Sequence, residues 1–397
     1  MTTIAEQFIE VLRQAGVRRI YGLVGDSLNP VVDAVRRTGG SAKGGIDWVH
    51  VHNEEGAAFA AAAEAQLTGR LAVCAGSSGP GNTHLIQGLY DAHRSGAPVL
   101  AIASHIPAAE IGTGFFQETH PDRVFTDCSH YCELISQPEQ MPRILRIAIQ
   151  HAVGKRGVAV LALPGDLAHE RAVADTGTGV CSTSAPASIP AATEVDALAA
   201  KLNQAEKVMI MAGAGCRDAH EEVMQLAGAL HAPVGHALRG KEFIQYDNPF
   251  DVGMSGLLGY GACYEAMQEA DLVLLLGTDF PYPKFLPQRN TVQVDIDPAH
   301  LGRRSVLELG VVGDVAQTVR AVVPKLRNRT DRGYLDAMLR KHERALSTVV
   351  AAYTGKADNR KVESQRPVHP EYLADLLDTE AERDAVFTVD TGMCNVW

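Results

Sequence analysis

The sequence predicts an α/β protein with two doubly wound or Rossmann-like parallel sheets and the beginning of a third α/β unit. Three observations lead to this prediction. At 397 residues the chain is too long for one compact core. Its 46% hydrophobic and 21% charged residues are typical of globular domains. Short apolar runs alternate with helical patterns, which is typical of parallel sheets covered by helices.

The first domain is predicted to span residues 1–175. An amphipathic pattern over 1–15 predicts an opening helix and not a secretory signal. Alternation of apolar runs with helical patterns then predicts a doubly wound parallel sheet that ends near Gly165 and Asp166. Its strands are expected at 20–24, 48–51, 71–75, 99–103 and 158–163.

Residues 176–193 are rich in Gly, Ser, Thr, Ala and Pro and are predicted to be an exposed linker. A second α/β domain is expected over 193–326, with helices around 221–230 and 264–269. Its strands are predicted at 208–211, 233–236, 272–276 and 292–296.

The remaining residues predict a charged linker over 327–366, with a helical piece at 334–351, and the start of a third domain over 367–397. A helix is expected to open at Pro370, and 385–392 resemble a first strand and turn. A lone helix and strand cannot bury their own apolar faces. We therefore expect the chain to be the front part of a longer protein.

Composition excludes several classes of function. A formal net charge of -11 without a basic stripe argues against nucleic-acid binding. The longest apolar runs are far shorter than a membrane span. Seven cysteines without paired Cys-x-x-Cys spacing predict free thiols in a reducing compartment, and therefore a cytoplasmic location. The sequence contains no recognisable motif for a metal cluster.

Glu54 is the most informative residue of the first domain. It stands between a strand at 46–51 and an alanine-rich helix at 57–67, with Asn53 as the expected N-cap. Ligands of open α/β sheets bind at the carboxyl ends of the strands. The competing interpretation is that Glu54 only complements the helix dipole.

Three loops follow strands of the same domain. Segments 22–27 and 76–82 are rich in glycine, which lets a ligand approach the backbone, although sharp strand-to-helix turns need glycine in any case. Segment 112–121 is polar and aromatic and could line a small pocket, whereas Phe116 could equally serve in packing.

These residues together resemble the thiamine-diphosphate-dependent enzymes, and within them the pyruvate oxidases and the ubiquinone-linked pyruvate dehydrogenases of bacteria. The resemblance covers nearly the whole chain. It rests on segments 22–27, 54–59, 74–82, 116–121, 236–242, 246–249 and 253–257.

The resemblance implies a pyrimidine-binding first domain in which Glu54 relays a proton to the cofactor, with Phe116 and Gln117 near the reacting carbon. It implies that thiamine diphosphate is bound in this domain by a further set of residues. These are Gly25, Asp26, Ser27, Gly79, Pro80, Gly81 and Asn82.

The second domain would bind FAD. The implied cofactor-binding residues are Arg239, Lys241, Ser255, Gly256, Leu257, Leu258, Thr278, Asp279, Phe280, Pro281, Tyr282 and Asp295. Gly213 and Gly215 form only a partial dinucleotide fingerprint, so a structural turn is as good an interpretation there as a contact. Asp297 ranks below Asp295, because it could simply end a strand.

Two departures from the family pattern stand out. Close relatives carry histidine directly before the relay glutamate, whereas this chain has Asn53, which cannot carry a proton. The family's Gly-Asp-Gly motif with its later asparagine, which holds Mg²⁺, is absent from the sequence and is expected beyond Trp397, as is a membrane-docking segment.

The resemblance implies oxidative decarboxylation of pyruvate to acetate and carbon dioxide, with electrons passed through FAD to a quinone, in a homodimer or homotetramer at the inner face of the membrane. The chain alone is expected to be inactive. Two alternatives stay open: another reaction on a 2-oxo acid, such as acetolactate synthesis, and a flavin-binding or assembly remnant without activity.

Overall fold

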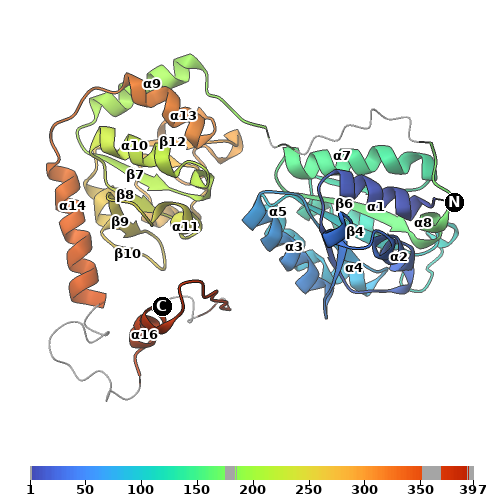
Figure 1. Ribbon diagram of the computed structural model, residues 1–397. Coiled ribbons are helices and arrows are strands. Elements are labelled where there is room, and N and C mark those ends of the chain that lie inside the picture. Colours follow the sequence, from blue (N-terminus) through green and yellow to red (C-terminus); the bar gives the residue numbers. More distant parts are fainter. Residues whose placement is uncertain (1, 175–183, 185, 351–367, 391, 393–397) are drawn as a thin grey trace. The chain divides into compact units, whose positions relative to one another are not determined.

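The computed structural model describes residues 2–174, 184, 186–350, 368–390 and 392. The chain divides into two compact units, Met1–Pro186 and Ala187–Trp397 (Figure 1). The predicted linker over 176–193 lies largely outside the described residues.

The first unit is built on a six-stranded sheet with the order β2-β1-β3-β4-β6-β5, and every pairing is parallel. The predicted parallel sheet is therefore confirmed. Its strands are β1 (Arg19–Gly22), β2 (Asp47–His50), β3 (Ala72–Gly76), β4 (Val99–His105), β5 (Tyr131–Leu134) and β6 (Val158–Pro164). The sequence did not predict β5, because this short edge strand is only half-buried and has no apolar run.

Helices cover both faces of this sheet. One core cluster joins it to α1 (Ile4–Gln14), α2 (Asn29–Arg37) and α7 (Met141–Gly154). The other joins it to α3 (Glu54–Thr68) and α5 (Ile86–Arg94). The opening helix starts with a capping box between Thr3 and Glu6. The remaining helices are the short α4 (Pro80–His84), α6 (Pro121–Val124) and α8 (Gly165–His169).

The second unit has a seven-stranded sheet with the order β10-β9-β8-β7-β11-β12-β13, in which only the β9 and β10 pair is antiparallel. Four of its strands were predicted, whereas β9, β10 and β13 were not. The strands are β7 (Val208–Ala212), β8 (Val234–His236), β9 (Asp251–Met254), β10 (Tyr260–Gly261), β11 (Leu272–Leu276), β12 (Thr291–Asp295) and β13 (Leu307–Val312).

Two helical layers enclose this second sheet. Core clusters place α9 (Ala192–Gln204), α10 (His220–Leu230) and α13 (Val315–Val322) on one face. The other face is covered by α12 (Cys263–Glu269) and α14 (Gly333–Arg344). A single turn of helix, α11 (Lys241–Ile244), follows β8.

The segment expected to form a charged linker contains a packed helix. Within α14, Leu335 and Met338 are buried, and the hydroxyl of Tyr334 donates to the carbonyl of Ala266 at 2.6 Å. Up to Arg344 this segment therefore belongs to the core of the second unit. A π-helix, Ala345–Val350, follows α14, and residues 351–366 lie outside the described part of the chain.

The predicted third-domain helix is present as α16 (Pro370–Glu380), which begins at Pro370. The predicted strand at 385–392 is wrong for its described residues, because 385–390 form no strand. A strand needs a neighbour to pair its backbone groups, and no strand of the described chain pairs with this segment.

Across the described residues, no helix is both long and apolar enough to cross a membrane. Cys74, Cys128, Cys132, Cys216 and Cys263 are free thiols, as predicted. Burial raises the pKa of Cys74 to about 12, so this thiol is protonated and inert at neutral pH. The other two cysteines of the sequence lie outside the described residues.

Candidate functional site

Four segments that the sequence singled out meet at the carboxyl edge of the first sheet. They follow β1, β2, β3 and β4, and parallel pairing brings the ends of these strands to one side. Side-chain contacts join them: the amide of Ser78 donates to Ser27 Oγ at 2.9 Å, and Ser78 Oγ donates to Gln117 Oε1 at 3.2 Å.

Glu54 is buried within this edge, with only 4% of its surface exposed. It is the first residue of α3, which starts three residues earlier than the apolar pattern predicted. Asn53 is the N-cap, as expected, and its side chain accepts from the amide of Glu55 at 2.8 Å. A residue that only complemented the helix dipole would gain nothing from being buried, so the burial of Glu54 favours a role in binding or chemistry.

The glycines of the 76–82 loop let its backbone pack closely against this carboxylate and against Gln117. A Cβ atom at Gly81 would lie 2.9 Å from Glu54 Oε1, and one at Gly79 would lie 2.8 Å from the Cβ of Gln117. Gly79 also has φ 72°, ψ −116°, a conformation open essentially to glycine alone. These two glycines are therefore required by close approach, beyond the needs of a turn.

Asn82 provides an unpaired acceptor at the same edge. It is 1% exposed, its Nδ2 donates to the carbonyl of Ser104 at 2.7 Å, and its Oδ1 has no partner among the described groups. A buried acceptor without a partner is costly unless a ligand or water supplies one.

Other residues that the resemblance placed near the cofactor lie around the carboxyl edge of the first sheet. Gly25 sits against Ser77, where a Cβ would lie 2.5 Å from that side chain's Cβ, while Asp26 is exposed. Pro80 is exposed at the start of α4. Phe116 is 79% exposed, which argues against a packing role within the described first unit.

Sequence reasoning missed two residues of this site. His84 Nδ1 lies 3.1 Å from Glu54 Oε2, a contact between positions 30 residues apart that no local spacing reveals. Glu118 accepts from the amides of Gly112 at 2.5 Å and Gly114 at 2.7 Å, and these backbone hydrogen bonds lower the pKa of its carboxyl group. It fixes the loop that carries Phe116 and Gln117.

Replacing Gly79 with alanine is expected to push Gln117 away from Ser78 and to cost about 1–3 kcal/mol, because both the backbone conformation and the space exclude a side chain. Gly114→Ala is the control, since Gly114 also has positive φ but a Cβ there meets nothing within 4 Å. Thermal unfolding and hydrogen exchange of the 112–121 loop compare the two. Equal effects would contradict the close contact.

In the second unit the carboxyl ends of β7, β8, β11 and β12 form the corresponding edge. A Cβ at Gly215 would lie 2.7 Å from the Cα of Gly277, and one at Gly213 would lie 2.5 Å from the Gly277 carbonyl oxygen. The partial fingerprint is thus explained by packing of two turns against each other.

The predicted loops of this second edge also come together. Gly256 approaches Phe280, since a Cβ there would lie 3.2 Å from the ring, and Ser255 is 4% exposed with an unpaired Oγ. Several other residues predicted for this edge are open to a ligand, whereas Thr278 and Phe280 are buried. The exposed ones are Arg239, Leu257, Pro281 and Tyr282; Lys241 and Leu258 are half-buried.

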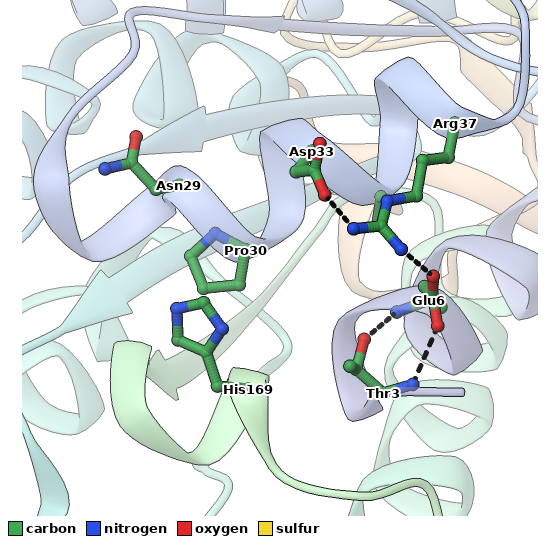
Figure 2. A pocket seen from close by; sticks show the side chains of 8 residues that line it. Thr3, Glu6, Asn29, Pro30, Asp33, Arg37 and His169 are labelled. Atoms are coloured by element: carbon green, nitrogen blue, oxygen red, sulfur yellow. Dashed lines mark hydrogen bonds and ion pairs between the residues drawn. The ribbon is translucent and has the colours of Figure 1, made fainter. Parts of the chain in front are cut away.

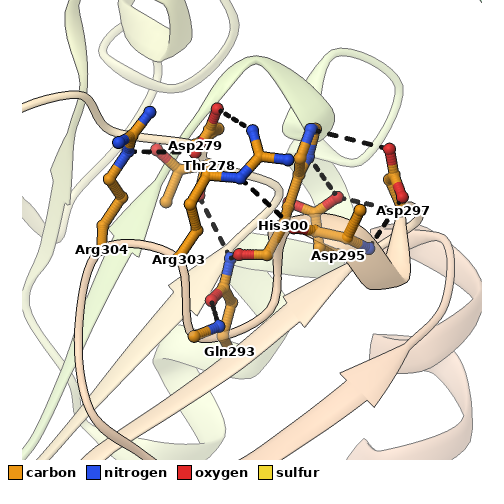
Figure 3. A network of polar contacts seen from close by, with 10 residues as sticks. Thr278, Asp279, Gln293, Asp295, Asp297, His300, Arg303 and Arg304 are labelled. Carbon is orange, nitrogen blue, oxygen red and sulfur yellow. Dashed lines mark hydrogen bonds and ion pairs between the residues drawn. The ribbon is translucent and has the colours of Figure 1, made fainter.

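A polar network surrounds Asp295 (Figure 3). Its Oδ1 accepts from the amide of Asp297 at 3.0 Å and lies 3.2 Å from His300 Nδ1, and burial raises the pKa of Asp295. Asp279 pairs with Arg303 at 3.0 Å and with Arg304 at 3.4 Å. Asp297 caps the next turn through Ala299, and it lies beyond β12, which already ends at Asp295.

A separate hollow of about 280 Å³ lies between α1, α2 and α8 (Figure 2). Arg37 pairs there with Glu6 at 2.9 Å and with Asp33 at 2.7 Å, so these charges satisfy one another. None of the predicted site residues lines this hollow. We therefore place the candidate site at the strand edges.

Two models of one enzyme family match this chain. Residues 2–124 match the family described as thiamine pyrophosphate enzyme, N-terminal TPP binding domain. Residues 195–322 match thiamine pyrophosphate enzyme, central domain. The candidate edges fall within these two matches.

Curated relatives extend the similarity along the chain. An uncharacterised 42.6 kDa protein of Pseudomonas amyloderamosa is 56% identical over 87% of this chain and 86% of its own length. YdaP of Bacillus subtilis is 34% identical over 100% of this chain and 67% of its own length. Pyruvate oxidase of Lactiplantibacillus plantarum is 30% identical over 98% of this chain but only 63% of its own length, and acetolactate synthases also match at 30% or less.

Proposed function

Because the chain belongs to the thiamine pyrophosphate enzyme family, we propose that it forms the pyrimidine-binding and flavin-binding parts of an enzyme that oxidatively decarboxylates pyruvate. The observation that carries this proposal is the buried carboxylate of Glu54, which stands beside Gly81 at a sheet edge. When bound, thiamine diphosphate supplies the electron sink that lets a 2-oxo acid lose carbon dioxide, and FAD accepts the electrons.

The residues of the first edge fit the pyrimidine end of this cofactor. Glu54 would exchange a proton with a ring nitrogen of the cofactor. Because Glu54 is buried, water does not compete for that proton. Gly81 lets the loop approach Glu54 closely, and Asn82 Oδ1 is an unpaired acceptor. Gln117, held by Ser78, would face the substrate together with the exposed Phe116.

Asn53 takes no part in this proton exchange in the proposal, because its side chain is committed to the helix start. The Mg²⁺ that the resemblance implies has no matching ligand set, since no group of three acidic, histidine or cysteine side chains that could hold a metal is found in the described residues. No step is assigned to a metal here.

FAD is proposed for the edge of the second unit. The buried, unpaired Ser255 Oγ and the positive φ of Gly256 support it, as does the acid Asp295 at a strand end. Purified from cells, the chain is expected to be yellow, with flavin absorbance that Ser255→Ala lowers. Ser347→Ala is the control, because the exposed Ser347 lies in the π-helix that follows α14 and not at this edge. Colourless protein that takes up no added FAD would contradict this assignment.

The electron acceptor is proposed to be a quinone, and the location the cytoplasm, peripheral to the inner face of the membrane. We further propose a homodimer or homotetramer. Acetolactate synthesis is the second candidate, favoured by the matches to acetolactate synthases. An enzyme completed with a diphosphate-binding domain separates the two: pyruvate-dependent reduction of a quinone analogue supports the first, and acetolactate supports the second.

A further inference from the structure

The loop that follows β4 contains a tight turn at residues 115–118. The amide of Glu118 donates to the carbonyl of Phe115 at 2.9 Å and closes the turn between its first and fourth residues. Gln117 is the third residue of this turn and has φ 64°. Glycine and asparagine adopt a positive φ at this place readily, whereas a glutamine is strained there. The chain therefore keeps a strained glutamine where glycine would be free of strain.

The strained residue connects this turn to the glycine loop beside Glu54. Gln117 Oε1 accepts from Ser78 Oγ at 3.2 Å. A Cβ atom on Gly79 would lie 2.8 Å from the Cβ of Gln117 and 3.1 Å from its carbonyl oxygen. Backbone strain is often stored at functional sites, where the surrounding structure holds it in place. The conformation of Gln117 thus sets the turn against the loop that also contacts Glu54.

The carboxylate of Glu118 binds three backbone amides of the same loop. Its Oε1 accepts from the amide of Gly112 at 2.5 Å. Its Oε2 accepts from the amide of Gly114 at 2.7 Å and from that of Phe115 at 3.2 Å. Because both oxygens are used, a side chain with a single acceptor oxygen cannot replace all three hydrogen bonds.

Burial of apolar surface does not fix this loop. Residues 112–117 are all exposed, and the ring of Phe116 is 79% exposed. Exposed amides can be satisfied by water, so the three hydrogen bonds to Glu118 are not needed to satisfy them. Their consequence is order, because hydrogen bonds to an ionised acceptor are stronger than those to a neutral one.

We propose that Glu118 is a positioning residue for the proposed reaction, because its carboxylate holds the turn that keeps Gln117 against Ser78. This inference rests on the proposed function, in which Gln117 and Phe116 face the substrate. Glu118 itself touches neither substrate nor cofactor in this account, since both its oxygens are committed to the backbone of its own loop.

The held turn decides which group of Gln117 meets the substrate. Its Oε1 is occupied by the hydroxyl of Ser78, so the side chain presents Nε2 as a donor. A 2-oxo acid offers carboxylate and carbonyl oxygens, which are acceptors that suit this donor. A turn that relaxed to a negative φ would move the donor, and a misplacement of about 1 Å can cost roughly 100-fold in rate.

Hydrogen exchange of the full chain, followed by NMR, tests the hold on the loop without any cofactor. In Glu118→Gln the amides of Gly112 and Gly114 should exchange about tenfold faster, the loss of one charge-assisted hydrogen bond, and their proton resonances should move upfield. The amides of β3 and β4 should change little, because these strands are buried in the sheet.

Steady-state kinetics of the completed enzyme test the effect on the reaction. With pyruvate and an electron acceptor, Glu118→Gln should lower kcat by roughly 10–100-fold. Its affinity for thiamine diphosphate and its melting temperature should stay at the wild-type values, because the turn lies outside the core and beside the substrate. A merely structural role would lower the melting temperature and leave kcat of the folded enzyme unchanged.

Glu110→Gln is the matched control. It removes the same charge from the same loop, but the carboxylate of Glu110 accepts from the Thr113 hydroxyl at 3.3 Å, a bond that glutamine can also accept. Wild-type exchange at Gly112 and Gly114 in Glu118→Gln, or a loosened turn with unchanged kcat, would overturn the proposal. If the completed wild type fails to decarboxylate pyruvate, the proposed function is wrong, and the exchange data alone decide whether Glu118 orders the turn.

Discussion

Glu54→Gln is expected to lower the turnover of the completed enzyme by about 10²–10⁴-fold, the usual contribution of a positioned acid or base. Glutamine keeps the length of the side chain and its hydrogen bond to His84, but it cannot exchange a proton with a ring nitrogen. The measurement is the steady-state rate with pyruvate and an electron acceptor, in this chain joined to or mixed with a diphosphate-binding domain.

Glu55→Gln is the control for this prediction. Glu55 is exposed, stands next to Glu54 and shares the first turn of α3, so both acids complement the same helix dipole. If Glu54 acted only through the dipole, the two variants would have the same small effect. Loss of activity in Glu54→Gln alone would separate chemistry from helix stabilisation.

Gly88→Ala is expected to destabilise the first unit by about 1–3 kcal/mol through overpacking. Gly88 lies where α5 crosses the alanine-rich face of α3, and a Cβ there would lie 2.5 Å from the Cβ of Ala58 and 2.6 Å from the amide nitrogen of Phe59. The backbone of α3 cannot move aside as a flexible side chain can. The melting temperature should fall by roughly 2–12 °C.

Gly56→Ala on α3 is the matched substitution. A Cβ at Gly56 meets nothing within 4 Å, so alanine should leave stability unchanged or raise it by about 0.5–1 kcal/mol through helix propensity. A melting temperature of Gly88→Ala equal to that of Gly56→Ala would show that α3 and α5 are not in close contact.

The fold was predictable where burial left a strong pattern. Strands such as β6 and β11 are buried on both faces and therefore appear as continuous apolar runs. Of the missed strands, β5, β10 and β13 lie at sheet edges and keep partly polar sequences, whereas β9 is a short strand inside the second sheet. Residues 385–390, the described part of the strand expected at 385–392, have a strand-like sequence but pair with no strand of the described chain.

Part of the candidate site was predictable because its residues follow predicted parallel strands. Glu54 and the glycine loops follow strands, so parallel topology alone brings them to one edge. The contact of His84 with Glu54 depends on how α4 is set against α3, which spacing does not encode. Likewise, the sequence left open whether the glycines at 213 and 215 serve a turn or a ligand contact, and the structure packs them against the turn at Gly277.

An NMR titration of the full chain with thiamine diphosphate tests most directly whether the carboxyl edge of the first sheet binds the cofactor. Millimolar concentrations of the cofactor allow weak binding to be detected. The amide resonances of Glu54, Gly79, Gly81 and Gln117 should shift together in the wild type and much less in Glu54→Gln. Shifts confined to the hollow between α1 and α2, or an equal response in Glu54→Gln, would contradict the assignment of this edge to the cofactor.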